Sequence, residues 1–125
     1  YTYAENSLGF WLQNNLNLER NPYDRIVHFS FGILLYFPMK EFFLTYLNYP
    51  KHLATHLPTV LVLALSGGFE IIEWLVADIF FPEHGDAYLG LQGDIWDAQK
   101  DMALAFLGSF ISSIFFYKKI DEIKN

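Results

Sequence analysis

The chain has 125 residues, of which 53% are hydrophobic, 19% aromatic and 18% charged, and its net charge is −6. Soluble domains are less apolar and more charged, so this composition excludes an ordinary soluble protein. The modest charge without a basic stripe excludes a nucleic-acid surface, and the lack of cysteine excludes disulfides and thiolate metal sites. The charged residues gather at the ends of long apolar runs, which is typical of membrane proteins.

The first expected element is a short helix in the segment SLGFWLQNNLNL. Its apolar residues Leu8, Trp11, Leu12 and Leu16 are spaced to share one side, with polar residues between them. This pattern indicates a short N-terminal helix that lies in the membrane interface.

Three later segments are long and apolar enough to cross a bilayer, which takes about 20 helical residues. They cover residues 24–47, 58–81 and 94–117. Pro38 is expected to kink the first span, and Pro58 to occupy the first turn of the second. The stretch FPEHGDAYLGLQG before the third span contains a proline and three glycines, which favour an irregular loop. The fold class predicted is all-α, a polytopic transmembrane helical bundle.

We expect residues 1–125 to form a single transmembrane domain. Residue 1 is Tyr, and both methionines, Met39 and Met102, are internal. These observations indicate a piece of a longer chain with further helices upstream.

Basic residues near the ends of the spans predict the orientation, because they favour the cytoplasmic side. Lys40 and Lys51 flank the turn between the first two spans, and Lys118, Lys119 and Lys124 follow the third. We therefore expect that turn and the C-terminus to lie in the cytoplasm, with the protein in the bacterial inner membrane. Arg20 and Arg25 at the other end oppose this assignment.

Ionisable residues lie on one face of each predicted span, in the half that should face outward. They are Asp24 and His28 in the first span, Glu70 and Glu73 in the second, and Asp94, Asp97 and Asp101 in the third. Spacings of three and four place each group on one helix face. Each such residue costs about 2.5–3.5 kcal/mol at the bilayer centre, so we expect the three groups to share one interior site.

One imidazole among carboxylates is a ligand set suited to Mg, Mn or Ca, or to Zn or Fe. The candidate metal ligands are His28, Glu70, Asp94, Asp97 and Asp101. A divalent metal ion held there could activate water or polarise a phosphoryl oxygen. Without a metal, close carboxylates would hold protons and act as an acid/base pair or a proton relay.

The candidate catalytic residues are His28 and Asp97, with Glu70 or Glu73 as general base. Arg25 and Asp24 are expected to bind substrate at the rim, Arg25 through a phosphate or as the counter-ion of Asp24. Asp24 and Asp94 have a simpler explanation as helix N-caps, whereas Asp97 and Asp101 lie beyond capping reach. The glycines Gly67 and Gly68 are expected to allow close helix approach.

Several motifs, in order along essentially the whole chain, resemble the YjdF-type bacterial inner-membrane proteins. They are YTYAE, LERNPYDRIVHFSFG, FEIIEW and YLGLQGDIWDAQKDMALAFLG. This resemblance implies further transmembrane helices upstream and supplies no activity. The chain is more distantly similar to the VanZ-like proteins, associated with resistance to teicoplanin. The matching positions are Asp24, Arg25 and His28, then Glu70 and Glu73, then Asp94, Asp97, Asp101 and Gly108, with Asp101 where VanZ-like proteins tend to have Asn.

Three functions fit these observations. The first is a metal-dependent enzyme that acts on a lipid or lipid-linked envelope substrate. The second is an ion- or proton-coupled transporter or ion-binding module, which the apolar inner halves of the spans disfavour. The third is a structural subunit that binds membrane lipid and a protein partner, or a second copy of itself, through the faces around Gly67, Gly68 and Gly108.

Overall fold

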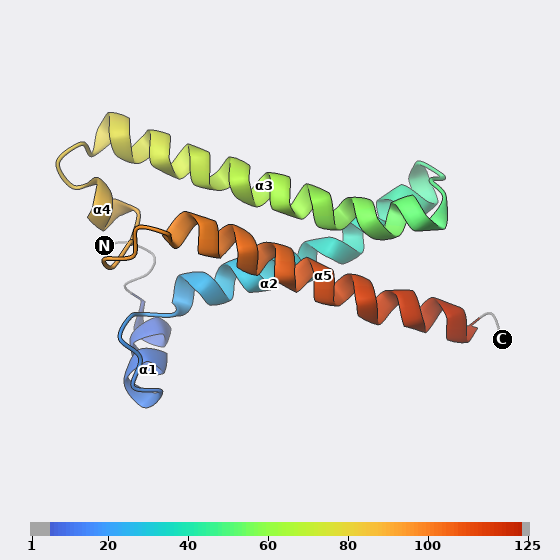
Figure 1. The fold of residues 1–125 in the computed structure, drawn as a ribbon, viewed down its shortest axis with the longest axis horizontal. Coiled ribbons are helices and arrows are strands. Elements are labelled where there is room, and N and C mark those ends of the chain that lie inside the picture. Colours follow the sequence, from blue (N-terminus) through green and yellow to red (C-terminus); the bar gives the residue numbers. More distant parts are fainter. Residues whose placement is uncertain (1–5, 124–125) are drawn as a thin grey trace.

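The computed structural model describes the backbone of residues 6–123 and the side chains of residues 6–116 (Figure 1). Within this range the chain is all-α and contains no strand. The helices are α1 (Ser7–Asn15), α2 (Tyr23–Glu41), a π-helix η2 (Phe42–Tyr46), α3 (Lys51–Phe80), α4 (Gly85–Tyr88) and α5 (Asp97–Ile123). The all-α prediction is confirmed.

Three long helices, α2, α3 and α5, run side by side and make up most of the fold (Figure 1). The α2–α5 contact is the most extensive, and α3 packs against both of the others. α1 lies across the direction of the long helices at the end where α2 begins (Figure 1). The turn from η2 to α3 lies at the opposite end, which α5 also approaches (Figure 1).

Among the described residues, two helices are long and apolar enough to cross a membrane: α2 with η2 (Tyr23–Tyr46), and α3. Only 28% and 17% of their apolar windows are buried inside the protein, so these are not core helices of a soluble protein. The described part of α5 falls short of the same criterion, because acidic and basic residues begin it and three serines follow. The third span therefore stays a prediction.

The observed helices differ from the predicted ones at several boundaries. The prediction that Pro58 starts the second span was wrong, because α3 begins at Lys51, directly after Pro50, and Pro58 lies buried inside it. A proline inside a helix removes one backbone hydrogen bond, and the polar stretch before Pro58 still forms two helical turns. The loop before α5 is not wholly irregular, since it contains the single turn α4.

Pro38 lies inside α2, and four residues later the α-helix becomes the wider π-helix η2. The Phe42 N–H donates to the carbonyls of both Pro38 and Met39. The kink expected at Pro38 stays a prediction, and what the structure shows is a change of helix type after that residue.

A close helix approach lies between α2 and α5 at Gly32 and Gly108. A Cβ atom on Gly32 would overlap the Ala105 carbonyl oxygen, and one on Gly108 would overlap the Phe29 carbonyl oxygen. Small residues at such crossings let helix backbones pack directly together. Gly108 is thus buried against α2, and the expectation that it lies on an oligomer face was wrong.

Gly67 and Gly68, which were expected to allow close helix approach, are less confined. A Cβ on Gly68 would meet nothing within 4 Å, and one on Gly67 would lie 3.3 Å from the Met102 sulfur. The expected close approach at this pair is therefore absent at Gly68 and moderate at Gly67.

Candidate functional site

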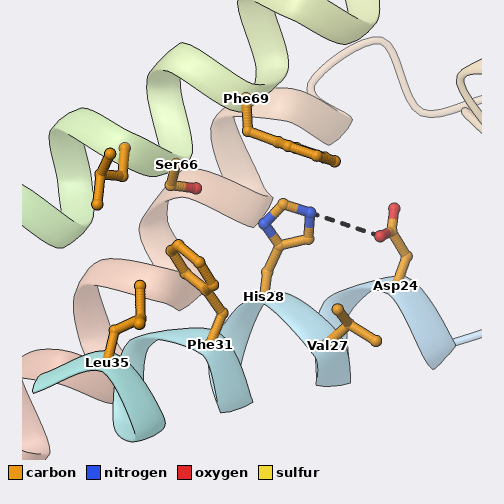
Figure 2. Close-up of a pocket in the computed structure, with 8 residues that line it drawn as sticks. Asp24, Val27, His28, Phe31, Leu35, Ser66 and Phe69 are labelled. Atoms are coloured by element: carbon orange, nitrogen blue, oxygen red, sulfur yellow. Dashed lines mark ion pairs between the residues drawn. The ribbon is translucent and has the colours of Figure 1, made fainter. Parts of the chain in front are cut away.

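A buried group of three ionisable side chains lies where α2 crosses α5. Asp24 and His28 are one turn apart on α2, and Asp101 faces them from α5. Their exposed fractions are only 4%, 6% and 2%. One ligand atom from each side chain lies within 4.8 Å of the other two, an arrangement that could hold a metal ion. His28 Nε2 is 3.5 Å from Asp24 Oδ1 (Figure 2).

α3 adds two glutamates to this group. Glu70 Oε1 lies 3.5 Å from His28 Nε2, and Glu73 lines the same cavity as Glu70 and Asp101. This acidic cavity has a volume of about 510 Å³ between α3 and the start of α5. Glu70 Oε1 and Asp101 Oδ1 are buried and have no hydrogen-bond partner in the described part of the chain. Buried carboxyl oxygens without partners are costly, so the site favours an added cation or proton.

Asp94 and Asp97 instead form a network with basic side chains at the rim. Arg20 Nη1 lies 2.5 Å from Asp97 Oδ1, and Arg25 Nη2 lies 2.6 Å from Asp94 Oδ2. Each arginine also contacts the other aspartate: Arg20 Nη1 lies 3.5 Å from Asp94 Oδ2, and Arg25 Nη2 lies 3.3 Å from Asp97 Oδ1. Lys100 Nζ lies 2.6 Å from Asp94 Oδ2. Asp97 is buried, and two guanidinium groups balance its charge.

The rim network has a measurable electrostatic consequence at Asp94, which lies before α5. Chiefly the hydrogen bond from Lys100, and then those from the Trp96 N–H and Arg25, lower the pKa of the Asp94 carboxyl to about 2. The Trp96 N–H donates to Asp94 Oδ1 at 3.1 Å, which is a local side-chain turn before α5 and not the predicted N-cap of that helix. The predicted helix start at residue 94 is thus three residues early, because α5 begins at Asp97.

The structure divides the predicted metal ligands into two groups. His28, Glu70 and Asp101 come together, and Asp24, which we expected to bind substrate, joins them. Asp97 and Asp94, by contrast, are paired with arginines. Arg25 forms ion pairs with Asp94 and Asp97, and its expected role as counter-ion of Asp24 stays a prediction.

Sequence reasoning used Arg20 only for orientation and missed its place in the site. It lies 77 residues from Asp97 in the sequence, and no local spacing could have paired the two. The nearest signal was its position just before Asn21-Pro22, at the entry to the first span.

Asn21 connects three parts of the fold and thereby positions the site. Its N–H donates to Gln92 Oε1 at 2.8 Å, and Gln92 Nε2 donates back to the Asn21 carbonyl at 3.3 Å. Asn21 Oδ1 accepts from the Tyr23 N–H, and Gly9 of α1 packs so closely that a Cβ there would overlap the Asn21 side chain. These contacts hold the loop before α5 against the start of α2.

The halves of the long helices remote from the acidic cavity, which were expected to be the inner halves, have a more polar interior than the sequence suggested. Thr59 and Ser109 are buried and joined by a hydrogen bond of 3.3 Å between their hydroxyls. The buried Tyr36 hydroxyl donates to the Thr55 carbonyl at 3.1 Å. Further buried polar groups there are Lys40, Ser112 and Ser113. The expectation of apolar inner halves was wrong, because the serine and threonine side chains face the bundle interior.

Apolar, outward-facing long helices around a buried His/carboxylate group define an integral membrane protein of the all-α class. The chain belongs to the family described as "Predicted membrane protein (DUF2238)", whose profile matches residues 1–122. It is 39% identical over 117 residues to the Inner membrane protein YjdF of Escherichia coli (strain K12). That alignment covers 92% of this chain and 55% of YjdF, so the chain spans about half the length of this curated relative. No solved structure matches the chain.

The likeness to YjdF-type proteins is thus confirmed, and with it the membrane setting. The more distant likeness to VanZ-like proteins stays a prediction.

Proposed function

We propose that this chain carries the reaction site of a membrane enzyme that binds a divalent metal ion between Asp24, His28 and Asp101. The observation that carries the proposal is the meeting of these three buried side chains, each with a ligand atom within 4.8 Å of the others. Glu70, 3.5 Å from His28 Nε2, is available as a fourth ligand or as a general base.

Carboxylate oxygens and one imidazole nitrogen are ligand atoms that suit a divalent metal ion such as Mn²⁺, Mg²⁺ or Zn²⁺. A bound ion would offset the repulsion among the buried carboxylates and would polarise a substrate oxygen or activate a water molecule. Glu73 lies in the same acidic cavity and could accept the proton from that water.

The membrane arrangement we propose has α5 as a third span and the metal site in the outer half of the bilayer. Lys40 and Lys51 lie at the end of the bundle remote from the site, and basic residues favour the cytoplasm. The C-terminus is then cytoplasmic, although the lysines after residue 116 lie outside the described side chains. Residues 1–125 would form one transmembrane domain of a longer protein.

A lipid or lipid-linked substrate with an anionic head group suits the rim. Arg25 Nε, Arg20 Nε and Arg20 Nη2 are buried without hydrogen-bond partners among the described residues, although both guanidinium groups pair with aspartates. These remaining donors point to an anionic acceptor with several oxygens, such as a phosphate, for which planar guanidinium groups are well suited.

Metal binding to the intact purified protein tests the proposal directly. Titration with Mn²⁺ or Zn²⁺ should show one ion per chain, and Asp101→Asn should weaken that binding by at least about tenfold, because a direct ligand is lost. Asp94→Asn is the matched control, since Asp94 is also acidic but pairs with arginine and lysine. Absence of binding in the wild type, or unchanged binding in Asp101→Asn, would refute the metal site.

A second function, an ion- or proton-coupled transporter, is favoured by the buried polar groups that continue into the inner half. The Thr59–Ser109 pair and Lys40 extend the polar interior away from the acidic cavity. Proteoliposomes that hold a pH-sensitive dye would show proton movement driven by an ion gradient, and Thr59→Val with Ser109→Ala should slow it. No movement in the wild type would exclude this alternative.

A further inference from the structure

A second cavity lies between α2 and α3 and shares the lining residue Asp24 with the acidic cavity. Its volume is about 490 Å³, and all of its lining residues come from these two helices (Figure 2). Five are apolar: Val27, Phe31, Leu35, Leu65 and Phe69. We call this space the apolar slot.

The apolar slot faces outward from the bundle. Val27, Leu65 and Phe69 are exposed, and α5, which packs against both helices, contributes no lining residue. Both walls belong to the two helices that are long and apolar enough to cross a membrane. Where no further helix of the longer protein covers it, the slot borders lipid hydrocarbon, which fills apolar space readily.

Three polar residues, Asp24, His28 and Ser66, also line the apolar slot. Asp24 and His28 lie toward one end, and Asp24 also lines the acidic cavity. The Ser66 hydroxyl is buried, with 1% of the residue exposed, and has no hydrogen-bond partner in the described structure. In Figure 2 Ser66 points from α3 into the space beside the His28 ring.

The dimensions favour a single hydrocarbon chain over a helix. From Asp24 to Leu35 the slot follows three turns of α2, roughly 16 Å at 1.5 Å per residue, so its volume corresponds to a mean cross-section of roughly 30 Å². A helix about 10 Å wide has a cross-section of roughly 80 Å². A helix could therefore cover the slot but not enter it, whereas a single extended chain could enter it.

We propose that the apolar slot holds one hydrocarbon chain of a bilayer lipid and presents the polar end of that lipid to His28 and Asp24. This inference rests on the proposed function, whose substrate class it specifies. The lipid reaches the metal site sideways from the bilayer, between α2 and α3, without its chain leaving the apolar phase.

Photocrosslinking tests the slot in the intact protein. Vesicles of phosphatidylethanolamine and phosphatidylglycerol would contain a phosphatidylglycerol with a diazirine group along one acyl chain. After illumination, mass spectrometry should locate the label on peptides around Val27 to Leu35 and Leu65 to Phe69. Val27→Trp and, independently, Leu65→Trp should fill the slot and lower this labelling several-fold. Leu34→Trp is the matched control, because Leu34 is on α2, is 70% exposed and does not line the slot.

The outcomes separate this inference from the metal site. Asp101→Asn should lose the metal and keep the label, whereas Val27→Trp should lose the label and keep the metal. Label spread evenly over the lipid-facing surfaces, or unchanged by both tryptophans, would overturn the slot. So would crosslinks from the slot to another segment of the intact protein, which would show that the occupant is protein.

Discussion

Replacing Gly32 by alanine should destabilise the protein because α2 and α5 meet backbone to backbone at this residue. The new Cβ would overlap the Ala105 carbonyl oxygen and lie 2.8 Å from the Ala105 carbonyl carbon and 2.9 Å from the Ser109 nitrogen. None of these atoms can move away by side-chain rotation, so the helices themselves must separate.

The magnitude follows from two opposing effects. Overpacking a close contact costs about 1–3 kcal/mol, and a contact with rigid backbone belongs at the upper end of that range. Alanine recovers about 0.5–1 kcal/mol over glycine inside a helix. We therefore expect Gly32→Ala to lower the free energy of unfolding by about 2 kcal/mol. Gly68→Ala, where a Cβ meets nothing within 4 Å, should raise it by about 0.5–1 kcal/mol.

Unfolding of the purified protein in mixed detergent–SDS micelles, followed by circular dichroism, would measure both changes. Gly32 lies one helical turn from His28, and Ala105 lies one turn from Asp101, so separation of the helices should also weaken metal binding. Equal stability of the Gly32→Ala and Gly68→Ala variants would refute the close α2–α5 contact.

Two further predictions concern the rim network. Arg20→Gln should lower the free energy of unfolding by about 2–3 kcal/mol. This is less than the loss of about 3–5 kcal/mol that is typical when a buried ion pair is fully broken, because Arg25 still contacts Asp97. Lys100→Gln, in an exposed pair, should cost under about 1 kcal/mol in the same micelle assay, and equal costs for the two variants would contradict the burial argument. In the folded protein the pKa of Asp94 is lowered to about 2, chiefly by the Lys100 hydrogen bond. The ionised carboxylate therefore stabilises the folded state fully above its ordinary pKa near 4, and this stabilisation is lost as the pH falls toward 2. Thermal unfolding should therefore depend less steeply on pH between 4 and 2 in Asp94→Asn than in the wild type, and parallel curves would disprove this assignment.

The helix faces that carry the site could be predicted because they depend on local spacing. Residues three or four apart share a face, so Asp24 with His28 and Glu70 with Glu73 were correctly grouped on their helices. The meeting of His28 with Asp101 also followed, since a bilayer penalises separate charges and favours a common interior.

The choice of partners within the site could not be predicted from local spacing. Arg20 and Asp97 are 77 residues apart, and their pairing depends on the loop geometry that Asn21 and Gln92 hold in place. Whether a carboxylate meets an arginine or a histidine therefore depends on rotations of α5 that the sequence pattern leaves open.

Helix contacts and boundaries were missed for similar physical reasons. Gly32 and Gly68 look alike in the sequence, and only the crossing of α2 with α5 distinguishes a confined glycine from an open one. Pro58 resembles a helix start, yet the helix already begins after Pro50, because one lost hydrogen bond does not outweigh the packing of a 30-residue helix.

The long sequence separation of the site's partners has a consequence for how the protein is made. A chain that emerges from its N-terminus delivers α2 to the membrane well before α5. Until α5 arrives, Asp24 and His28 lack Asp101, and Arg20 lacks Asp97, its partner at 2.5 Å. In the proposed arrangement, with α5 as a third span, the ionisable residues of α2 would oppose early insertion of that helix, and the arrival of α5 would offset part of that cost. Assembly of the site would then accompany the insertion of α5.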